Sequence, residues 1–285
     1  MAETNSGKRL RLLTYLCPEV SPDVFFILRD CIEEVTGLET DLILENRFTG
    51  PPSNRTDPFT ANLADIVAMQ SSDYLRLKSQ GQKQMELCPA APVYRHPMAQ
   101  DRPVYFSEII INSANKKKYE SISNLKGCSW AFSSEDSISG NKVVLKYLKS
   151  TLRTNAAYFG TIVPSGNHLN SIQMVKDFRV DAAAVDSSVL ARYIREHEES
   201  RDKFVSLVSL GPLPVHPLLF NSHLPVELKQ RITDALLAMF KSRSWASRLN
   251  DVGIAKFASI DSSLYNLEED ITMGLQGMSI NPTYY

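Results

Sequence analysis

The sequence predicts an α/β fold in which mainly parallel strands are flanked by helices. Two observations lead to this prediction. Short apolar runs of strand length alternate with helical patterns from the start, with a strand at residues 10–16, a helix after Ser21 and a strand at residues 42–44. Polar turns then follow several later strands and open the next helix. This order is typical of parallel sheets, because parallel neighbours need a long crossover connection.

The first helix carries sequence signals at both ends. Ser21 is a capping residue, Pro22 suits the first turn, and Asp23 places a negative charge near the positive end of the helix dipole. Gly37 suits the left-handed conformation that commonly ends a helix. Between these ends, apolar residues recur at helical spacing: Phe25, Leu28, Ile32 and Val35. We therefore expect an amphipathic helix between Ser21 and Gly37.

Further elements continue the alternation. Strands are expected at residues 64–69, 90–94, 104–111, 128–132, 160–163, 181–185, 205–210 and 218–220. Helices are expected at residues 74–82, 121–125, 143–152, 169–178 and 264–275, with two more that start at Asp186 and Pro225. Residues 46–62 are rich in Pro, Asn, Thr and Gly and are predicted to form a loop. The proline-rich residues 211–214 are predicted to join two strands.

The composition indicates a globular protein without a strongly charged partner. The chain has 285 residues, enough for about two domains of common size. Hydrophobic residues make up 43% and charged residues 22%, and the formal net charge is -1. A near-neutral chain lacks the electrostatic attraction of basic proteins to nucleic acids and acidic membranes. We therefore expect no nucleic-acid binding. No apolar run approaches transmembrane length, so we expect no membrane insertion either.

The cysteines and the N-terminal residues favour a reducing compartment. The four cysteines are scattered without metal-ligand spacing: Cys17, Cys31, Cys88 and Cys128. Such cysteines are expected to be reduced and mostly buried. The N-terminal residues contain no apolar core of signal-peptide length before the first strand. The sequence therefore predicts a cytoplasmic protein with reduced thiols.

One strand-to-helix turn combines the features of an anion-binding site. Residues 133–142 connect a predicted strand to a predicted helix. Ser137 and Ser139 supply hydroxyl donors, and Gly140 lets a ligand approach the backbone. The first amides of a helix lack intrahelical partners and lie at the positive end of its dipole, which suits a phosphate-like or carboxylate group. An ordinary N-cap, in which a serine satisfies the helix end without a ligand, is the alternative explanation.

Two further polar turns follow this one, at residues 165–168 and 186–188. In an open α/β sheet the carboxyl ends of parallel strands share one edge, where ligands bind. The three turns are therefore expected to lie side by side. His168 is then a candidate ligand contact, although a histidine near a helix start is often only a cap or a surface residue. Asp186 is another candidate, with an N-cap as its alternative role.

The same residues raise the alternative of nucleophilic catalysis. Ser137 or Ser139 would be the nucleophile, His168 the base and Asp186 the group that orients it. The sequence lacks the Gly-x-Ser-x-Gly elbow of many serine hydrolases. It also lacks a nucleotide-phosphate loop, a zinc pattern and a dinucleotide fingerprint, so no metal or cofactor is expected.

The order of several short motifs resembles a known family. The motifs are Ala64-Asp65-Ile66, residues 103–107, residues 124–127, residues 136–140, His168 and residues 181–187. Together they resemble the phosphonate/phosphate-type substrate-binding proteins of ABC transporters, which have the type 2 periplasmic binding protein fold. The resemblance covers residues 10–265. It implies two α/β lobes joined by two crossing strands, with residues 1–105 and 208–285 in one lobe and 106–207 in the other.

The resemblance also implies a ligand site between the lobes. The family's serine- and threonine-rich turn, which binds the oxyanion, maps onto Ser137, Ser139 and Gly140. Its crossing-strand tyrosine maps onto Tyr105, which alternatively packs as a half-buried strand aromatic. Its histidine on the next strand-to-helix turn maps onto His168. The implied ligand is a small anion.

The sequence departs from the family pattern at some candidate ligand positions. Ile138 stands where a hydroxyl residue is common, which removes one donor. The carboxylates that hold the ammonium of aminoalkyl phosphonates in the family fall near Ser188 and His216, neither of which is acidic. A ligand with an ammonium group is therefore not expected, and His216 is alternatively a plain loop residue. Met69, at the end of the strand 64–69, completes the candidate set.

The sequence leaves three classes of function open. The first is a binding protein that closes two lobes on an oxyanion-bearing ligand such as phosphate or a phosphonate. The second is a cytoplasmic enzyme on the same fold, since a few biosynthetic enzymes of thiamine and menaquinone pathways are built on it. The third is a ligand sensor that acts through a protein partner, which the sequence does not identify. Binding without turnover favours a sensor, and consumption of the ligand favours an enzyme.

Overall fold

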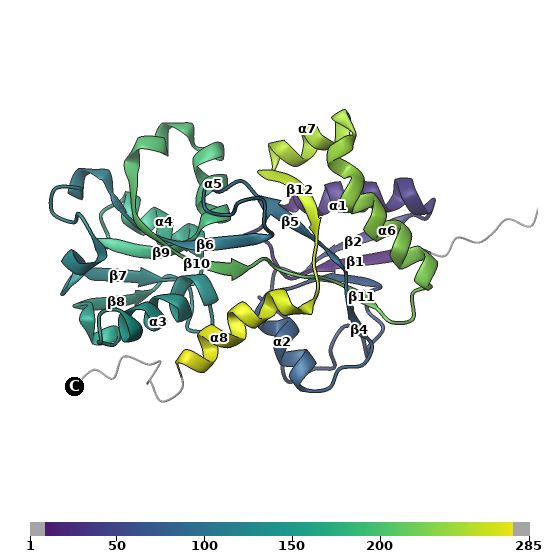
Figure 1. Ribbon diagram of the computed structural model, residues 1–285, viewed down its shortest axis with the longest axis horizontal. Helices are drawn as coiled ribbons and strands as arrows, with labels where there is room; N and C mark the ends of the chain where they lie inside the picture. Colours follow the sequence, from purple (N-terminus) through teal and green to yellow (C-terminus); the bar gives the residue numbers. More distant parts are fainter. Residues whose placement is uncertain (1–8, 276–285) are drawn as a thin grey trace, which may run out of the picture. The chain divides into compact units, whose positions relative to one another are not determined.

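The computed structural model describes residues 9–275, which form two compact units (Figure 1). The first unit contains the described residues up to Arg95 together with Gln100–Pro103 and Val215–Tyr265. The second contains His96–Ala99, Val104–Pro214 and the described residues from Asn266 onward. Each unit has its own sheet with helices packed on it. The α/β class predicted from the alternating pattern is confirmed.

Within the described residues, the first unit is built on a five-stranded sheet with the order β2-β1-β3-β11-β4. These strands are β1 (Leu10–Thr14), β2 (Thr40–Leu44), β3 (Ile66–Ala68), β4 (Met85–Leu87) and β11 (Leu218–Asn221). Strands β1, β2 and β3 are parallel, whereas β11 is antiparallel to β3 and β4. A separate pair joins β5 (Ala90–Tyr94) and β12 (Ile254–Ser259). The strand–helix–strand beginning is confirmed.

The described part of the first unit has four α-helices, and the first of them follows its sequence signals closely. They are α1 (Pro22–Thr36), α2 (Ser71–Ser79), α6 (Val226–Ala238) and α7 (Arg243–Asp251). The Ser21 hydroxyl caps α1 by accepting from the amide of Asp23 at 3.3 Å. Gly37 ends the helix at φ 72°, in the left-handed region, and its amide donates to the carbonyl of Glu33. Both predicted caps of this helix are confirmed.

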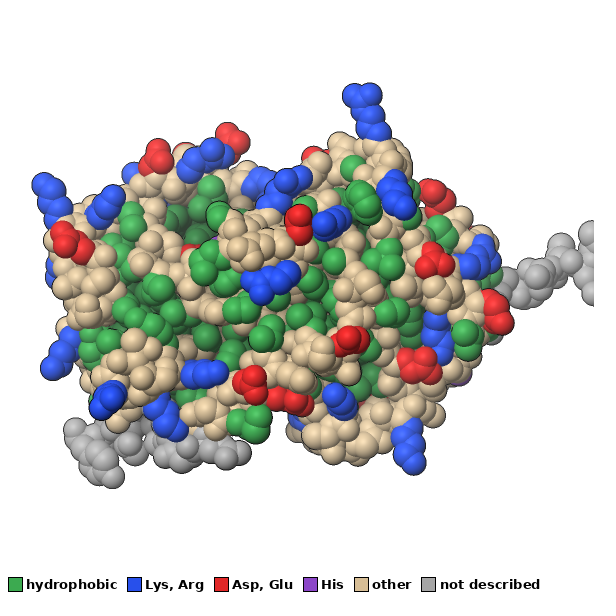
Figure 2. All heavy atoms as spheres, viewed as in Figure 1, with side chains coloured by type: hydrophobic (Ala, Val, Ile, Leu, Met, Phe, Trp, Pro, Cys, Tyr) green, Lys and Arg blue, Asp and Glu red, His purple; other side chains and the backbone are tan. Residues whose placement is uncertain are grey.

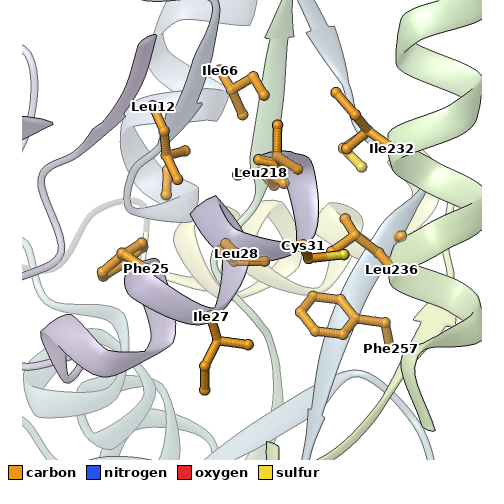
Figure 3. Packing of buried hydrophobic residues seen from close by; sticks show 14 of the residues in the cluster. Leu12, Phe25, Ile27, Leu28, Cys31, Ile66, Leu218, Ile232, Leu236 and Phe257 are labelled. Atoms are coloured by element: carbon orange, nitrogen blue, oxygen red, sulfur yellow. The ribbon is translucent and has the colours of Figure 1, made fainter. Parts of the chain in front are cut away.

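The core of the first unit lies on both faces of its sheet. On one face, side chains of β1, β3 and β11 meet those of α1 and α6, as Figure 3 shows for Leu12, Ile66, Leu28 and Leu236. The next residues along the strands point to the opposite face, where they meet α2 and the loop before β3. Burial of each such aliphatic side chain contributes roughly 1.5–3 kcal/mol. Period-two alternation along the strands therefore builds two core layers.

The second unit has the strand order β10-β6-β9-β7-β8 in its described part. The strands are β6 (Val104–Asn112), β7 (Ser129–Phe132), β8 (Thr161–Pro164), β9 (Ala182–Asp186) and β10 (Phe204–Pro214). Strand β7 is parallel to β8 and β9, whereas β6 is antiparallel to β9 and β10. The helices are α3 (Val143–Ser150), α4 (His168–Lys176), α5 (Ser187–Glu196) and α8 (Asn266–Gly274). A π-helical segment, Ile138–Lys142, leads into α3.

Short 3₁₀ turns complete the described chain. They span Ser113–Asn115, Ile122–Leu125, Ala156–Tyr158, Glu198–Lys203, Met239–Lys241 and Ser262–Tyr265. Strand β10 is longer than predicted, because it continues through Pro212 and Pro214 instead of ending at a joint. It lies at the edge of its sheet, where prolines are tolerated because one side of the strand needs no partner. Its register with β6 shifts between Leu210 and Leu213.

The two units differ from the predicted lobes in where the chain is divided. Residues 208–214 continue β10 and therefore belong to the second unit. The family resemblance assigns the C-terminal residues, and with them helix α8, to the first lobe. In the structure, α8 groups with the second unit. Its packing explains the difference: α8 contacts β10 and α3, and Lys149 Nζ donates to the carbonyl of Gly274 at 2.9 Å. These are tertiary contacts, which local sequence patterns do not encode.

The surface charges and the helix lengths bear on whether the described helices could span a membrane. Positive and negative side chains are interspersed over the face shown in Figure 2. No helix among residues 9–275 is long and apolar enough to cross a bilayer. All four cysteines lie in this range, and none forms a disulfide bond. Three of them, Cys31, Cys88 and Cys128, are buried, and Cys17 is partly buried.

A buried carboxylate connects β1 to the segment before β3 in the first unit. Asp65 is 5% exposed. It accepts hydrogen bonds from the backbone amide of Arg11 at 2.8 Å and from the guanidinium of Arg11, and it pairs with His223 Nε2 at 2.8 Å. Burial raises the pKa of Asp65, but the hydrogen bonds from Arg11 and His223 together outweigh it and hold that pKa below its usual value. No local sequence pattern predicts that His223 pairs with Asp65.

We expect Asp65→Asn to lower the free energy of unfolding by about 2 kcal/mol at neutral pH, because hydrogen bonds to a charged group contribute roughly 1.5–3 kcal/mol. A carboxylate with a depressed folded pKa stabilises the fold above its unfolded pKa of about 3.9. That stabilisation is lost as the pH falls through the folded pKa. The difference between variant and wild type should therefore shrink in acid. Denaturant unfolding at neutral and acid pH measures it.

Asp41→Asn is the matched control for this prediction. Asp41 also pairs with an arginine, Arg9, but both side chains are more than half exposed. Exposed pairs contribute about 0–1 kcal/mol, so this variant should unfold almost as wild type does. Equal destabilisation by the two substitutions would contradict the role assigned to Asp65.

Candidate functional site

Three strand-to-helix turns of the second unit meet at one edge of its sheet. Strands β7, β8 and β9 are parallel, so their carboxyl ends lie at the same edge. The turns that follow them lead into the Ile138–Lys142 segment, α4 and α5. Strand β6 runs in the opposite direction, and its register places Ser107 opposite Asp186 at this edge. The predicted meeting of the three turns is confirmed.

The first turn ends in an N-cap formed by Ser137. The Ser137 Oγ accepts a hydrogen bond from the amide of Gly140 at 2.9 Å. Its carbonyl accepts from the amides of Asn141 and Lys142. The cap explanation therefore holds for Ser137, and the Gly140 amide is already engaged. Ile138 is buried and begins a π-helical segment, a feature that is frequent at functional sites.

Gly140 is required by the close packing around it. An ideal Cβ at this position would lie 2.2 Å from Ser133 Oγ, 2.9 Å from Ser137 Oγ and 3.2 Å from His168 Cε1. Real Cβ atoms essentially never approach other heavy atoms as closely as the first two distances. Glycine thus allows three polar side chains to converge on the backbone of this turn.

Ser139 is held in place from two sides. It is 2% exposed. Its carbonyl accepts a hydrogen bond of 2.5 Å from the hydroxyl of Ser107, a fully buried residue of β6. Its own hydroxyl lies 3.2 Å from His168 Nε2. The backbone and the side chain of Ser139 are therefore both positioned before any ligand binds.

His168 directs the hydroxyl proton of Ser139. His168 begins α4, after the Asn167 side chain caps that helix. Its Nδ1 accepts from the backbone amide of Asp186 at 3.4 Å. A neutral imidazole that accepts at Nδ1 carries its proton on Nε2, so Nε2 donates to Ser139 Oγ. The hydroxyl of Ser139 is then left to donate its own proton to a further acceptor, which suits a ligand oxygen.

Asp186 and Ser188 form the cap of α5. The Asp186 Oδ1 accepts from the amide and the hydroxyl of Ser188, both at 2.7 Å, and from the amide of Val189 at 3.3 Å. The alternative cap role of Asp186 is therefore present. Its contribution to the first turn comes from its backbone amide, through His168. Neither side chain makes a hydrogen bond to Ser137 or Ser139 among the described contacts.

This arrangement does not support a charge-relay triad. In such a triad the imidazole donates from one nitrogen to a carboxylate and accepts from the serine at the other. Here His168 Nδ1 accepts from a backbone amide, and the recorded partner of Nε2 is Ser139. Among residues 9–275 there is also no cluster of three His, Cys, Asp or Glu side chains that could hold a metal ion.

The sequence pattern of one protein family matches residues 18–265. The family is described as the phosphonate, periplasmic substrate-binding proteins of ABC transporters. The chain belongs to this family. The resemblance seen in the short motifs is thereby confirmed, and the chain is a member of a ligand-binding family. A search of curated proteins found no match.

Solved structures of low sequence identity share the fold. PhnD1 from Prochlorococcus marinus, in complex with methylphosphonate, is 15% identical, with a TM-score of 0.71 over 95% of this chain and 99% of that chain. A binding protein component of an ABC phosphonate transporter from Pseudomonas aeruginosa is 16% identical, with a TM-score of 0.71 over 98% and 91%. A Xanthomonas citri protein bound to ATP is 14% identical, with a TM-score of 0.60 over 94% and 96%. The predicted two-lobed periplasmic binding protein fold is confirmed.

The family corrects the expected compartment. Its description names periplasmic proteins, so the prediction of a cytoplasmic protein is not supported. The thiols, on which that prediction partly depended, do not distinguish a periplasmic protein from a cytoplasmic one. Burial raises the pKa of Cys88 to about 11 and that of Cys31 to about 11. Thiols of this kind stay protonated and unreactive in either environment.

The family tyrosine maps onto a buried position of β6. Tyr105 is 3% exposed and pairs with Leu213 of β10. It lies two residues before Ser107, so the two side chains leave the strand on the same face. Ser107 contacts Ser139 from that face. A ligand contact for Tyr105 stays a prediction, and this placement is consistent with it.

Two candidates, Met69 and His216, belong to the first unit. Met69 has no exposed surface and packs in the core with Leu13 and Val67. The structure gives it a packing role, and we do not include it in the proposal below. His216 lies in the connection between β10 and β11 and is partly buried. Its part in ligand binding stays a prediction.

Sequence reasoning missed several polar contacts of the second unit. The hydroxyls of Ser107 and Ser133 meet the first turn, although neither residue was among the candidate ligand contacts. His96 also has partners that the sequence analysis did not identify, because its Nε2 lies 2.9 Å from Glu108 Oε1 and its ring stacks on Phe106. The signal was the pair Ser107–Glu108, which interrupts an otherwise apolar strand.

Proposed function

We propose that this protein binds a small phosphonate- or phosphate-like anion at the turn that carries Ser139. The observation that carries the proposal is the buried pair of Ser139 and His168. With Nδ1 of His168 engaged by the backbone of Asp186, the hydroxyl of Ser139 is oriented to donate. A hydrogen bond to a charged group contributes roughly 1.5–3 kcal/mol, so one such serine changes affinity about ten- to a hundredfold.

The helix start supports a negative charge at the same place. The Ile138–Lys142 segment continues into α3, and the first amides of such a segment carry the positive end of its dipole. The nearest carboxylate of the neighbouring turn, Asp186, is engaged in capping α5. An anion at the first turn therefore meets the positive end of this dipole.

The preferred ligand carries phosphorus and no ammonium group. Family membership and the structural likeness to a protein solved with methylphosphonate support a phosphonate or a phosphate. Ser188 and His216 occupy the places near which the family's ammonium-binding carboxylates are expected, and neither is acidic. The family description also supports a membrane transporter as the partner of the loaded protein.

Calorimetric titration of the wild-type protein tests this function. We expect one saturable site for methylphosphonate or inorganic phosphate, with acetate and 2-aminoethylphosphonate at least tenfold weaker. At a hundred times the dissociation constant, a bound anion should add about 2.7 kcal/mol to the free energy of unfolding and raise the melting temperature. The proposal fails if neither phosphorus anion produces heat of binding or a shift in melting.

A further inference from the structure

One buried hydroxyl of the second unit has no hydrogen-bond partner. Ser133 directly follows β7 and is 4% exposed. Among the described residues, its Oγ has no hydrogen-bond partner. Buried polar groups of native proteins are nearly always hydrogen-bonded, because an unpartnered one costs free energy. Each such exception needs a physical explanation, and a bound water or ion that supplies the missing partner is one of them.

This hydroxyl lies where the polar side chains of the proposed anion site converge. A Cβ built on Gly140 would be 2.2 Å from Ser133 Oγ, closer than to Ser137 Oγ or to His168 Cε1. Ser133 therefore sits directly against the backbone of the turn. It reaches that point from the end of β7, whereas His168 reaches it from the start of α4.

The hydroxyls of Ser137 and Ser139, in the same turn, each have a hydrogen-bond partner. Ser137 Oγ accepts from the amide of Gly140, and Ser139 Oγ pairs with His168. Ile138 is buried and has no hydroxyl to offer. Ser133 is thus the buried hydroxyl of this turn whose proton and lone pairs are unused in the described structure.

We propose that Ser133 is a further ligand-binding residue of this site. Its hydroxyl turns from Gly140 to another staggered rotamer and donates to one oxygen of a bound phosphonate or phosphate. A phosphonate has three terminal oxygens and accepts more hydrogen bonds than a carboxylate, and Ser133 supplies a donor that Ile138 cannot. The inference rests on the proposed function, since it needs an anion at the same turn.

The test compares Ser133→Ala with wild type in two measurements. In the ligand-free protein, this change removes an unpartnered hydroxyl, so the melting temperature should stay the same or rise. In titration with methylphosphonate, the affinity should fall about tenfold, because one hydrogen bond to the anion is lost. Ser133→Cys keeps the shape and replaces the hydroxyl by a weak donor, so it should bind about as weakly as the alanine variant.

Ser129→Ala is the matched control, at the first residue of β7. The Ser129 hydroxyl donates to Asp181 Oδ2 at 2.7 Å and accepts from the Asp181 amide at 2.9 Å. Its loss should lower the melting temperature and leave the affinity unchanged. If Ser133→Ala instead behaves like Ser129→Ala while wild type binds methylphosphonate, the role of Ser133 is overturned and the proposed function stands. If wild type binds neither methylphosphonate nor phosphate, both are overturned.

Discussion

Gly140→Val is expected to abolish binding of methylphosphonate, with a loss of affinity of at least about a hundredfold. The valine Cβ would lie 2.2 Å from Ser133 Oγ and 2.9 Å from Ser137 Oγ, and two further methyl groups extend from it. These contacts force the hydroxyls away from the turn and fill the space where an anion would approach the backbone. Titration calorimetry measures the affinity, and thermal unfolding shows whether the variant is folded.

Two further variants make this result interpretable. Gly140→Ala adds the same Cβ without the branched methyl groups. It should therefore fold even if the valine variant does not, and it should still bind the anion more weakly than wild type does. Gly274→Val is the control in the same unit, because a Cβ there meets only side-chain carbons of Lys146 at 3.5 Å or more. It should bind as wild type does. A folded Gly140→Val protein with wild-type affinity would rule out ligand approach at this glycine.

Ser139→Ala is expected to weaken binding of the same anion by about ten- to a hundredfold. The substitution removes a hydroxyl that donates to a charged ligand, and such hydrogen bonds contribute roughly 1.5–3 kcal/mol. It also leaves the His168 Nε2 without the acceptor that it has in the wild-type protein. The affinity is measured by calorimetry beside the melting temperature of the ligand-free variant.

Ser165→Ala is the control for the serine experiment. Ser165 belongs to the neighbouring turn, but its hydroxyl donates to the carbonyl of Phe132 at 3.0 Å and contacts Ser171. Its removal should lower stability and leave the affinity unchanged. If Ser139→Ala shows the same pattern, with normal affinity and a lower melting temperature, then Ser139 is a structural residue.

Local patterns predict those parts of the fold that depend on neighbours in sequence. The caps of α1 at Ser21 and Gly37 are encoded in adjacent residues, and both are found in the structure. Strand β4 has only three residues, too few for an alternating pattern to stand out in the sequence. Strand β12 likewise becomes a strand through its pairing with β5. Helix α8 is predicted as an element, but its unit depends on contacts with α3 and β10.

The candidate site, like the fold, could be predicted from the sequence only in part. Ser139 and His168 were predicted to meet because turns after parallel strands share one sheet edge, and their side chains are 3.2 Å apart. In the structure, Ser137 caps the helix and Ser139 pairs with His168. This assignment depends on the direction of each side chain, which the spacing in the sequence does not specify. Ser107 comes from an antiparallel strand, so its contact depends on the register of β6 against β9. Sequence patterns do not specify that register.

The most direct test of the anion site is an amide NMR titration of the isotope-labelled wild-type protein with methylphosphonate. Binding at the proposed turn should move the amide signals of Ile138, Ser139 and Gly140 most, together with that of His168, and the shifts should saturate at one equivalent. Ser139→Ala should need a higher concentration to reach the same shifts. Shifts that saturate elsewhere in the chain while these amides stay unchanged would contradict the proposed binding site.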